Sequence, residues 1–198
     1  MVQYKGKPGF IKCTNRKDNF DRERMALEVN DYAYSLNNQE KYDILPFVFY
    51  QIVEGIKYMN SLGLVHGDIK PESKHGSVYC NLKNRPIVTI IDFDLSQMVG
   101  KSGIAKSRGG TAGYFAPEDT LEVPIDQYKR DTWMVGATLY AALRGSSPYK
   151  HVEPLMSAWK YKIELMEKMM TIDPARRPRL DELESLLLES FKSAASTA

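Results

Sequence analysis

The chain has 198 residues, of which 43% are hydrophobic and 26% charged, a composition typical of one globular domain or of two lobes around a shared core. The 27 Lys and Arg residues against 25 Asp and Glu leave a formal net charge of +2, so composition gives no reason to expect nucleic acid or an anionic membrane as a partner. No apolar run is long enough to span a membrane, and the first residues lack the apolar core of a signal peptide. Cys13 and Cys80 fit neither a metal site nor a disulfide framework, so we expect a reducing, cytoplasmic location.

The first part of the chain predicts one strand and one helix. Residues 9–13 are expected to form a short strand that ends near Lys12. Apolar residues at helical spacing then predict a helix over 20–36, on which Glu28 lies. The polar stretch 37–43 is expected to form a loop.

The middle of the chain predicts one long buried helix followed by a pair of strands. Residues 44–62 carry apolar side chains at i, i+3 and i+4 spacing, which indicates a helix with a single buried stripe: Leu45, Val48, Phe49, Ile52, Ile56 and Met59. Gly63 is placed to end this helix. Residues 77–82 and 86–93 are expected to form two strands, because β-branched residues are frequent in the second.

The last part of the chain predicts a long loop and three helices. Residues 95–118 are rich in Gly, Ser and Lys and are expected to form the loop. A second buried helix is predicted over 128–143, with Gly145 ending it. Two further helices are expected near 156–170 and 180–192, with prolines between them.

Two acidic segments carry the residue types that phosphoryl transfer requires. Transfer from a nucleotide needs a carboxylate to take or orient the hydroxyl proton and a cation to offset charge on the moving group. Asp68 and Lys70 supply that pair within one loop. Asp92 follows a predicted strand and is available to hold Mg²⁺, because hard cations prefer oxygen ligands.

These segments resemble the sequence motifs of protein kinases. His66-Gly-Asp-Ile-Lys-Pro-Glu-Ser73 is similar to the catalytic loop, H-R-D-x-K-x-x-N, and Asp92-Phe-Asp94 is similar to D-F-G. Three later segments resemble the end of the activation segment, the buried D-x-W-x-x-G helix and the D-P-x-x-R-P motif: Gly110-Thr-Ala-Gly-Tyr-Phe-Ala-Pro-Glu118, Asp131-Thr-Trp-Met-Val-Gly136 and Asp173-Pro-Ala-Arg-Arg-Pro178. Five motifs in the family's order are far more specific than any one of them alone.

The resemblance implies an α+β, protein-kinase-like fold. A mainly helical large lobe would occupy 44–192, a truncated small lobe containing β-strands would occupy 1–43, and 193–198 would be a frayed tail. The implied activity is transfer of the γ-phosphate of ATP, with Mg²⁺, to Ser or Thr of a protein, because Lys70 and Thr111 match the Ser/Thr pattern and not the Tyr one. The implied partner is a protein, either a substrate or a regulated protein, and the oligomeric state is left open.

The resemblance also implies roles for individual residues. Asp68 would be the catalytic carboxylate and Lys70 the cation that neutralises the phosphate. Lys12 resembles the strand lysine that binds the α- and β-phosphates. Its partner on the predicted helix would be Glu28, with Glu23 as the second choice.

A structural ion pair is implied as well. The glutamate that ends the activation segment, Glu118, would pair with Arg177 of the late motif. The pair would be buried, so breaking it should cost several kcal/mol, on the order of 3–5.

Three positions depart from the family pattern around the metal and the activation segment. Ser73 would be a cofactor and metal ligand in place of Asn, and a hydroxyl is the weaker ligand. Asp94 replaces Gly beside the metal ligand Asp92, where it would either join the metal site or repel Asp92 when no metal is bound. Gly67 replaces the Arg that reads a phosphorylated activation segment, so activation by that route is not expected.

The small lobe leaves three functional hypotheses open. No G-x-G-x-x-G precedes Lys12, and the 56 positions from Lys12 to Asp68 leave no recognisable hinge. The first hypothesis is an active Ser/Thr protein kinase, and the second is a pseudokinase that serves as a binding or allosteric scaffold. A small-molecule kinase is third, because the Ala-Pro-Glu segment and the Asp131 helix belong to the branch of the family that acts on proteins.

Overall fold

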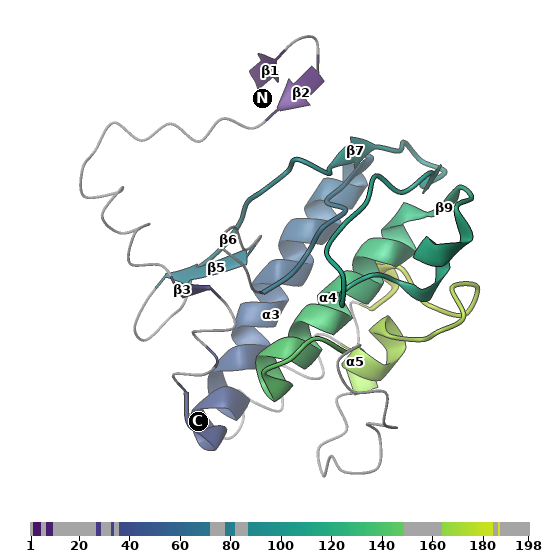
Figure 1. Ribbon diagram of the computed structural model, residues 1–198. Coiled ribbons are helices and arrows are strands. Elements are labelled where there is room, and N and C mark those ends of the chain that lie inside the picture. Colours follow the sequence, from purple (N-terminus) through teal and green to yellow (C-terminus); the bar gives the residue numbers. More distant parts are fainter. Residues whose placement is uncertain are drawn as a thin grey trace.

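Two long helices form the centre of the protein, and short strands surround them. The computed structural model describes residues 2–4, 7–9, 27–28, 33, 36–71, 78–81, 87–148, 164–183 and 186. Helix α3 (Asn38–Ser61) lies beside α4 (Gln127–Arg144), and the short α5 (Glu164–Met169) packs against α4 (Figure 1). The buried side chains of these helices make up most of the core.

The strands are short and antiparallel. A three-stranded sheet of order β3-β5-β6 lies against α3 and is made of β3 (Leu27–Glu28), β5 (Val78–Asn81) and β6 (Ile87–Ile90). The other strands form separate pairs: β1 (Val2–Tyr4) with β2 (Lys7–Gly9), β4 (Leu64–Val65) with β7 (Gln97–Met98), and β8 (Ile104–Ala105) with β9 (Ile125–Asp126). The register of β5 against β6 joins Val78 to Ile90 and confirms the strand pair predicted from the sequence.

Helix α3 confirms the predicted buried stripe but begins earlier than expected. All six predicted stripe residues are buried, and the helix ends at Ser61, just before Gly63. The loop expected over 37–43 is wrong, because Asn37 and Glu40 form a reciprocal capping box. The Asn37 side chain accepts from the Glu40 N–H at 3.0 Å, and the Glu40 carboxylate accepts from the Asn37 N–H at 2.8 Å. This cap lets the helix start within the polar stretch.

Removal of this cap should weaken the protein measurably. An Asn37→Ala variant is expected to lose about 1 kcal/mol of unfolding free energy, because an orphan N–H of the first helical turn loses its acceptor. Asn37→Gly serves as the control, since glycine is itself a fair N-cap and should cost only a few tenths of a kcal/mol. Urea unfolding of both variants measures the difference. Equal losses would show that the capping box is not what stabilises the start of α3.

The helix expected over 20–36 is wrong at Leu27 and Glu28. These residues form β3 and pair with Cys80 and Tyr79 of β5, so backbone pairing within the sheet overrides the helical spacing of the sequence. Glu28 therefore lies on a strand and not on a helix. Ala33 is helical and fully buried. Of the strand expected over 9–13, Gly9 ends β2, and the remainder lies outside the described residues.

Helix α4 confirms the prediction closely and is buried along nearly its whole length. Asp126 caps its first turn by accepting from the backbone N–H groups of Tyr128 and Lys129. Gly145 ends it with a left-handed φ of 77°, a conformation that costs a residue with a Cβ more than it costs glycine. Burial raises the pKa of Tyr128, whose hydroxyl donates to the Gly100 carbonyl at 2.6 Å.

The remaining predictions are met in part. The 95–118 segment is not all loop, because it contains β7, β8 and the start of the 3₁₀ helix η1 (Pro117–Leu121). The helix predicted near 156–170 is confirmed over Glu164–Met169, and 180–192 begins as the 3₁₀ helix η3 (Leu180–Leu183). The other residues of these two ranges lie mostly outside the described part.

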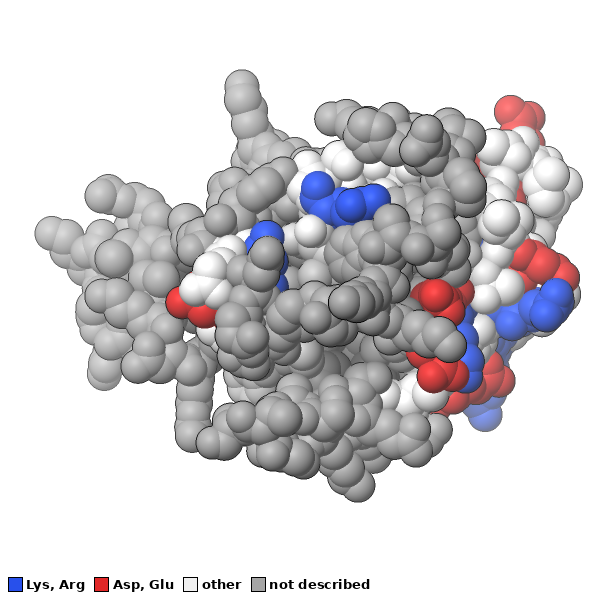
Figure 2. Space-filling view, turned by 90° about the horizontal axis from the view of Figure 1, so that it is seen from below, with Lys and Arg blue, Asp and Glu red and all other residues white. Residues whose placement is uncertain are grey.

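The described helices are too short or too polar to cross a membrane, and the surface charge is mixed. No helix among the described residues combines the length and the apolar character that a membrane crossing requires. On the face seen in Figure 2, acidic and basic side chains are interleaved along one edge, and neither sign forms a continuous patch in the coloured part. This mixture is what a formal net charge of +2 leads one to expect.

Candidate active site

The loop that carries Asp68 is fastened to α4 by a buried aspartate. Asp131 is fully buried, and its carboxylate accepts from the backbone N–H groups of His66 at 2.8 Å and Gly67 at 3.0 Å. Burial raises the pKa of Asp131, while the charges of His66 and Arg130 and the two hydrogen bonds act in the lowering direction. The two hydrogen bonds fix the backbone immediately before Asp68 to the buried helix α4.

His66 joins this loop to the segment that carries Asp92. The Nε2 atom of His66 lies 2.9 Å from the Ile91 carbonyl, and its ring lies 5.2 Å from the Phe93 ring. The Nδ1 atom accepts from the backbone N–H of Asp68 at 3.3 Å, which places the ring proton on Nε2, facing the Ile91 carbonyl. His66 is thus a structural bridge, and it brings the loop of Asp68 next to residues 91–93.

Asp68 and Lys70, which the sequence predicts as the catalytic carboxylate and the phosphate-neutralising cation, form a buried ion pair. The Lys70 ammonium donates to Asp68 Oδ2 at 2.5 Å and to the Thr111 hydroxyl at 2.7 Å. The Lys70 and Asp68 side chains are 9% and 10% exposed, so their charges act in a partly desolvated environment. The contact between Lys70 and Thr111 ties the catalytic-loop motif to the Gly110–Glu118 motif.

The second carboxylate oxygen of Asp68 has no hydrogen-bond partner among the described residues. Asp68 Oδ1 is buried and accepts no hydrogen bond from any residue that the structure describes. An unsatisfied buried acceptor costs about 1–3 kcal/mol, and such atoms in folded proteins call for an explanation. A hydroxyl group that donates to Oδ1 would satisfy it.

Asp92 lies in an uncommon backbone conformation. Its φ of 64° is left-handed, a region that Asp enters more readily than most residues and that is found often at functional sites. Asp92 is half-buried, and Asp94 is exposed. Within the described ranges, no group of three or more His, Cys, Asp and Glu side chains gathers around a metal position. Any metal bound by Asp92 and Asp94 would therefore need further oxygen ligands.

Several predicted site residues stay untested. Lys12 and Ser73 lie outside the described residues, so neither the Lys12–Glu28 pair nor the Ser73 ligand is placed. Glu28 is described only as part of β3. The structure brings Asp68, Lys70 and Thr111 together directly, and it connects them to the segment of Asp92 through His66.

The predicted ion pair between Glu118 and Arg177 is confirmed. The Arg177 guanidinium donates to both carboxylate oxygens, at 2.6 and 3.0 Å, and the two side chains are 0% and 4% exposed. The same guanidinium lies over the Trp133 ring, 4.8 Å from its centroid, and donates to the Thr171 carbonyl. The pair joins η1 to the segment of Arg177, which contacts α4 through Trp133 and the Lys129 carbonyl.

One functional cluster escaped the sequence analysis. Arg130 is 1% exposed and pairs with Asp119 at 2.6 Å, and it also contacts the loop of Asp68. A pocket of about 470 Å³ lies next to this pair, lined by Lys106, Phe115 and Val123 among others, and by none of the predicted catalytic residues. The available signal was the placement of an arginine in an otherwise buried helix, since a buried arginine needs partners.

Comparisons with known proteins agree with this geometry. The protein kinase domain family matches residues 23–191, and the chain belongs to that family. The Drosophila melanogaster ovarian-specific serine/threonine-protein kinase Lok is 27% identical over 71% of this chain. The R436 protein of Acanthamoeba polyphaga mimivirus, whose name assigns it to the serine/threonine-protein kinases, is 28% identical over 96% of this chain and 76% of its own length.

The predicted class is confirmed, because the fold is that of an α+β protein kinase domain with a reduced small lobe. The chain corresponds to only part of several relatives. It spans 33% of Lok and 20% of a Dictyostelium discoideum protein whose name assigns it to the same kinases and that is 28% identical over 79% of this chain.

Proposed function

We propose that this protein kinase transfers the γ-phosphate of ATP to Ser or Thr of a protein substrate. The observation that carries the proposal is the buried Asp68 carboxylate, which accepts from Lys70 through Oδ2, while no described residue donates to its Oδ1. A substrate hydroxyl that donates to Oδ1 would be held where its proton can pass to the carboxylate as the hydroxyl oxygen attacks. The Ser/Thr assignment follows from the Lys70–Thr111 contact and from the names of the relatives.

In the proposed reaction, the protein accepts the proton of the substrate hydroxyl and neutralises charge on the transferred phosphate. The substrate hydroxyl gives its proton to Asp68 Oδ1, its oxygen bonds to the γ-phosphorus, and the bond from that phosphorus to the bridging oxygen breaks to release ADP. Lys70 offsets negative charge beside the transferred group, and Thr111 keeps the ammonium pointed into the site.

The residues present could bind a magnesium nucleotide, because they offer carboxylate oxygens as metal ligands. Asp92 presents a half-buried carboxylate next to the Asp68 loop, and Asp94 adds a second carboxylate nearby in sequence, both oxygen donors of the kind that Mg²⁺ binds. Asp92, with Ser73 and Asp94 as further ligands, would hold the metal. Bound Mg²⁺ would neutralise the phosphates and orient them. Lys12 would hold the α- and β-phosphates, with Glu28 as its partner.

An Asp92→Asn variant tests the proposed role of Asp92. We expect it to lose roughly 100-fold or more of the transfer from labelled ATP to protein Ser and Thr, because several kcal/mol of charge stabilisation depend on the metal. It should also lose the rise in melting temperature that Mg-ATP gives the wild type. Asp94→Asn is the matched control and should be less affected, since Asp94 is exposed.

The same measurements separate the kinase from the pseudokinase. Asp94 in place of glycine and Ser73 in place of asparagine make the scaffold the second candidate. A scaffold would show no transfer, and no shift with Mg-ATP, in wild type and Asp92→Asn alike. A shift of several degrees that needs Asp92, together with labelled phosphoserine or phosphothreonine, contradicts the scaffold.

A further inference from the structure

Arg130 joins four segments of the protein through one guanidinium. It projects from the start of α4, and its side chain is 1% exposed. Nε donates to Asp119 at 2.6 Å, Nη1 donates to the Gly67 carbonyl at 2.9 Å, and Nη2 donates to the Gly109 carbonyl at 2.5 Å. The planar fork of a guanidinium suits three acceptors in different directions, which the single ammonium of lysine cannot reproduce.

The acceptors lie immediately beside the residues of the site. The Gly67 carbonyl belongs to the peptide bond that leads into Asp68. The Gly109 carbonyl belongs to the peptide bond between Gly109 and Gly110, just before Thr111. The Thr111 hydroxyl accepts a hydrogen bond from Lys70. Arg130 therefore fixes the backbone on both sides of the Asp68–Lys70–Thr111 contact.

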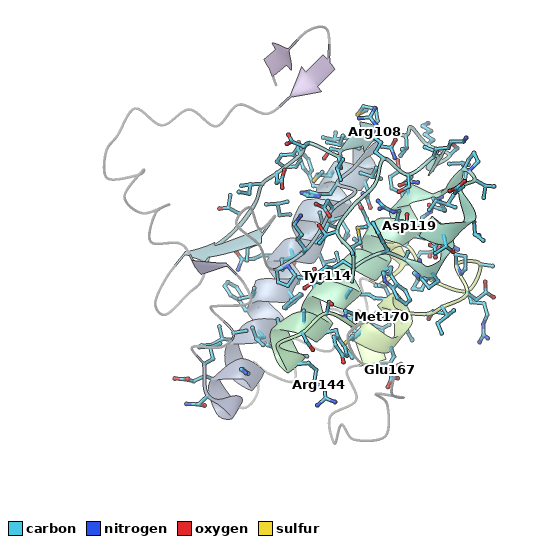
Figure 3. The ribbon with its side chains drawn as sticks, in the orientation of Figure 1. Arg108, Tyr114, Asp119, Arg144, Glu167 and Met170 are labelled. Carbon is cyan, nitrogen blue, oxygen red and sulfur yellow. The ribbon has the colours of Figure 1, made fainter. Side chains whose placement is uncertain are left out.

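Asp119, the ion-pair partner of Arg130, is itself held by a second hydrogen bond. Asp119 accepts from Arg130 through one carboxylate oxygen and from the Ala116 N–H, at 2.9 Å, through the other. Its side chain is 7% exposed, so the ion pair with Arg130 is shielded from solvent. Figure 3 shows Asp119 near the first turns of α4, with Tyr114, which precedes η1 in the chain, also labelled.

Gly67 has no side chain with which to anchor its own backbone. Gly67 has a φ of 82°, and a Cβ at this position would lie 2.9 Å from the Leu95 carbonyl, which is too close for any other residue. The donor to the Gly67 carbonyl therefore comes from outside the loop, and among the described residues it is Arg130. This bond adds a second connection to the 106–111 segment beside the one that Lys70 makes to Thr111.

From this geometry we infer that Arg130 is a positioning residue that holds 106–111 against the loop of Asp68 in the unphosphorylated protein. The three acceptors of Arg130 are a carboxylate and two backbone carbonyls, all supplied by the chain itself. No phosphate is needed to complete the cluster, so the site would be assembled as soon as the protein folds. The kinetic part of this inference rests on the proposed transfer reaction, whereas its structural part does not.

The test compares two equally buried arginines that receive the same substitution. Arg130→Lys keeps a positive charge near Asp119 but loses the fork, and Arg177→Lys makes the same change at the Glu118 pair, away from the loop of Asp68. Amide hydrogen exchange, followed by mass spectrometry, is measured on peptides that cover 66–70 and 104–111. We expect Arg130→Lys to speed exchange in both by about tenfold or more, and Arg177→Lys to leave them near wild type.

Two further measurements keep the result independent of folding defects. Asp119→Asn weakens the same cluster from the other side and should raise exchange in 104–111 in the same way. Wild-type protein treated with phosphatase, and shown by mass to carry no phosphate, should keep the full protection of 104–111. Equal exchange in the Arg130 and Arg177 variants, or loss of protection after phosphatase treatment, would overturn the inference.

The kinetic measurement separates this inference from the proposed function. If the wild type transfers phosphate, Arg130→Lys should lower kcat by about 100-fold with little change in KM for Mg-ATP, because a misplaced Asp68 weakens the chemical step and not nucleotide binding. Arg177→Lys should change kcat far less at a temperature well below both melting points. If wild type and Asp68→Asn transfer equally, the proposed function fails, while the exchange data still decide the role of Arg130.

Discussion

An Asp68→Asn variant is expected to fall by about 10²–10⁴-fold in kcat while it keeps its fold. Asn has the shape of Asp but cannot accept the hydroxyl proton, and it replaces the charge that Lys70 contacts at 2.5 Å. The Asp68 backbone N–H and its bond to His66 Nδ1 are untouched by the change. Initial rates of transfer from labelled ATP, at saturating Mg-ATP and protein substrate, measure the loss.

The controls for this variant come from its neighbours. A melting temperature within a few degrees of wild type would show that the lost rate is chemical. Thr111→Val removes the hydroxyl that holds Lys70 and should reduce kcat less than Asp68→Asn does, since Thr111 acts only through Lys70. An Asp68→Asn protein with wild-type kcat would remove Asp68 from the mechanism and return the chain to the scaffold hypothesis.

Glu118→Gln should be the most destabilising of the single substitutions considered. It leaves the Arg177 guanidinium charged and buried with no carboxylate, a situation that costs about 3–5 kcal/mol. At about 2–4 °C per kcal/mol for a chain of this size, the melting temperature should fall by roughly 10 °C. Urea unfolding gives the free energy directly, and the midpoint should move without a change of slope.

An exposed ion pair in the same protein supplies the comparison. Glu164 and Lys168 lie one turn apart on α5 at 3.3 Å, with side chains 62% and 45% exposed. Glu164→Gln should change stability by no more than about 0.5 kcal/mol, because solvent screens exposed pairs. The double variant Glu118→Gln/Arg177→Met should recover part of the loss, since it leaves no buried charge. Equal effects at the two pairs would contradict the role assigned to burial.

The elements with strong local patterns were the ones the sequence predicted well. The stripe of α3 and the span of α4 follow from apolar spacing and from the glycines that end the helices, so both are readable without tertiary information. The helix prediction was wrong at Leu27 and Glu28 because these residues pair with the edge of β5 instead. Their partners lie about fifty residues away in the chain, so local spacing could not reveal the pairing. The start of α3 failed because its cap comes from polar residues that resemble a loop.

The candidate site likewise contains residues that the sequence could predict and residues that it could not. Asp68, Lys70 and the Glu118–Arg177 pair could be predicted because each sits in a short motif with fixed spacing. The Arg130 cluster could not, because its acceptors are backbone carbonyls, which any residue can supply and no motif records. The unpartnered oxygen of Asp68 is likewise a property of packing, since it depends on what fails to reach it.

Four residues in the first two turns of α4 contact different parts of the protein. Lys129 donates to the Pro174 carbonyl, Arg130 holds Gly67 and Gly109, Asp131 binds the loop of Asp68, and Trp133 lies under Arg177. Each residue of an α-helix is rotated by about 100° from the one before it, so the helix fixes the directions in which these side chains point. One residue inserted or deleted near Arg130 would rotate every later contact of α4 by about 100° at once.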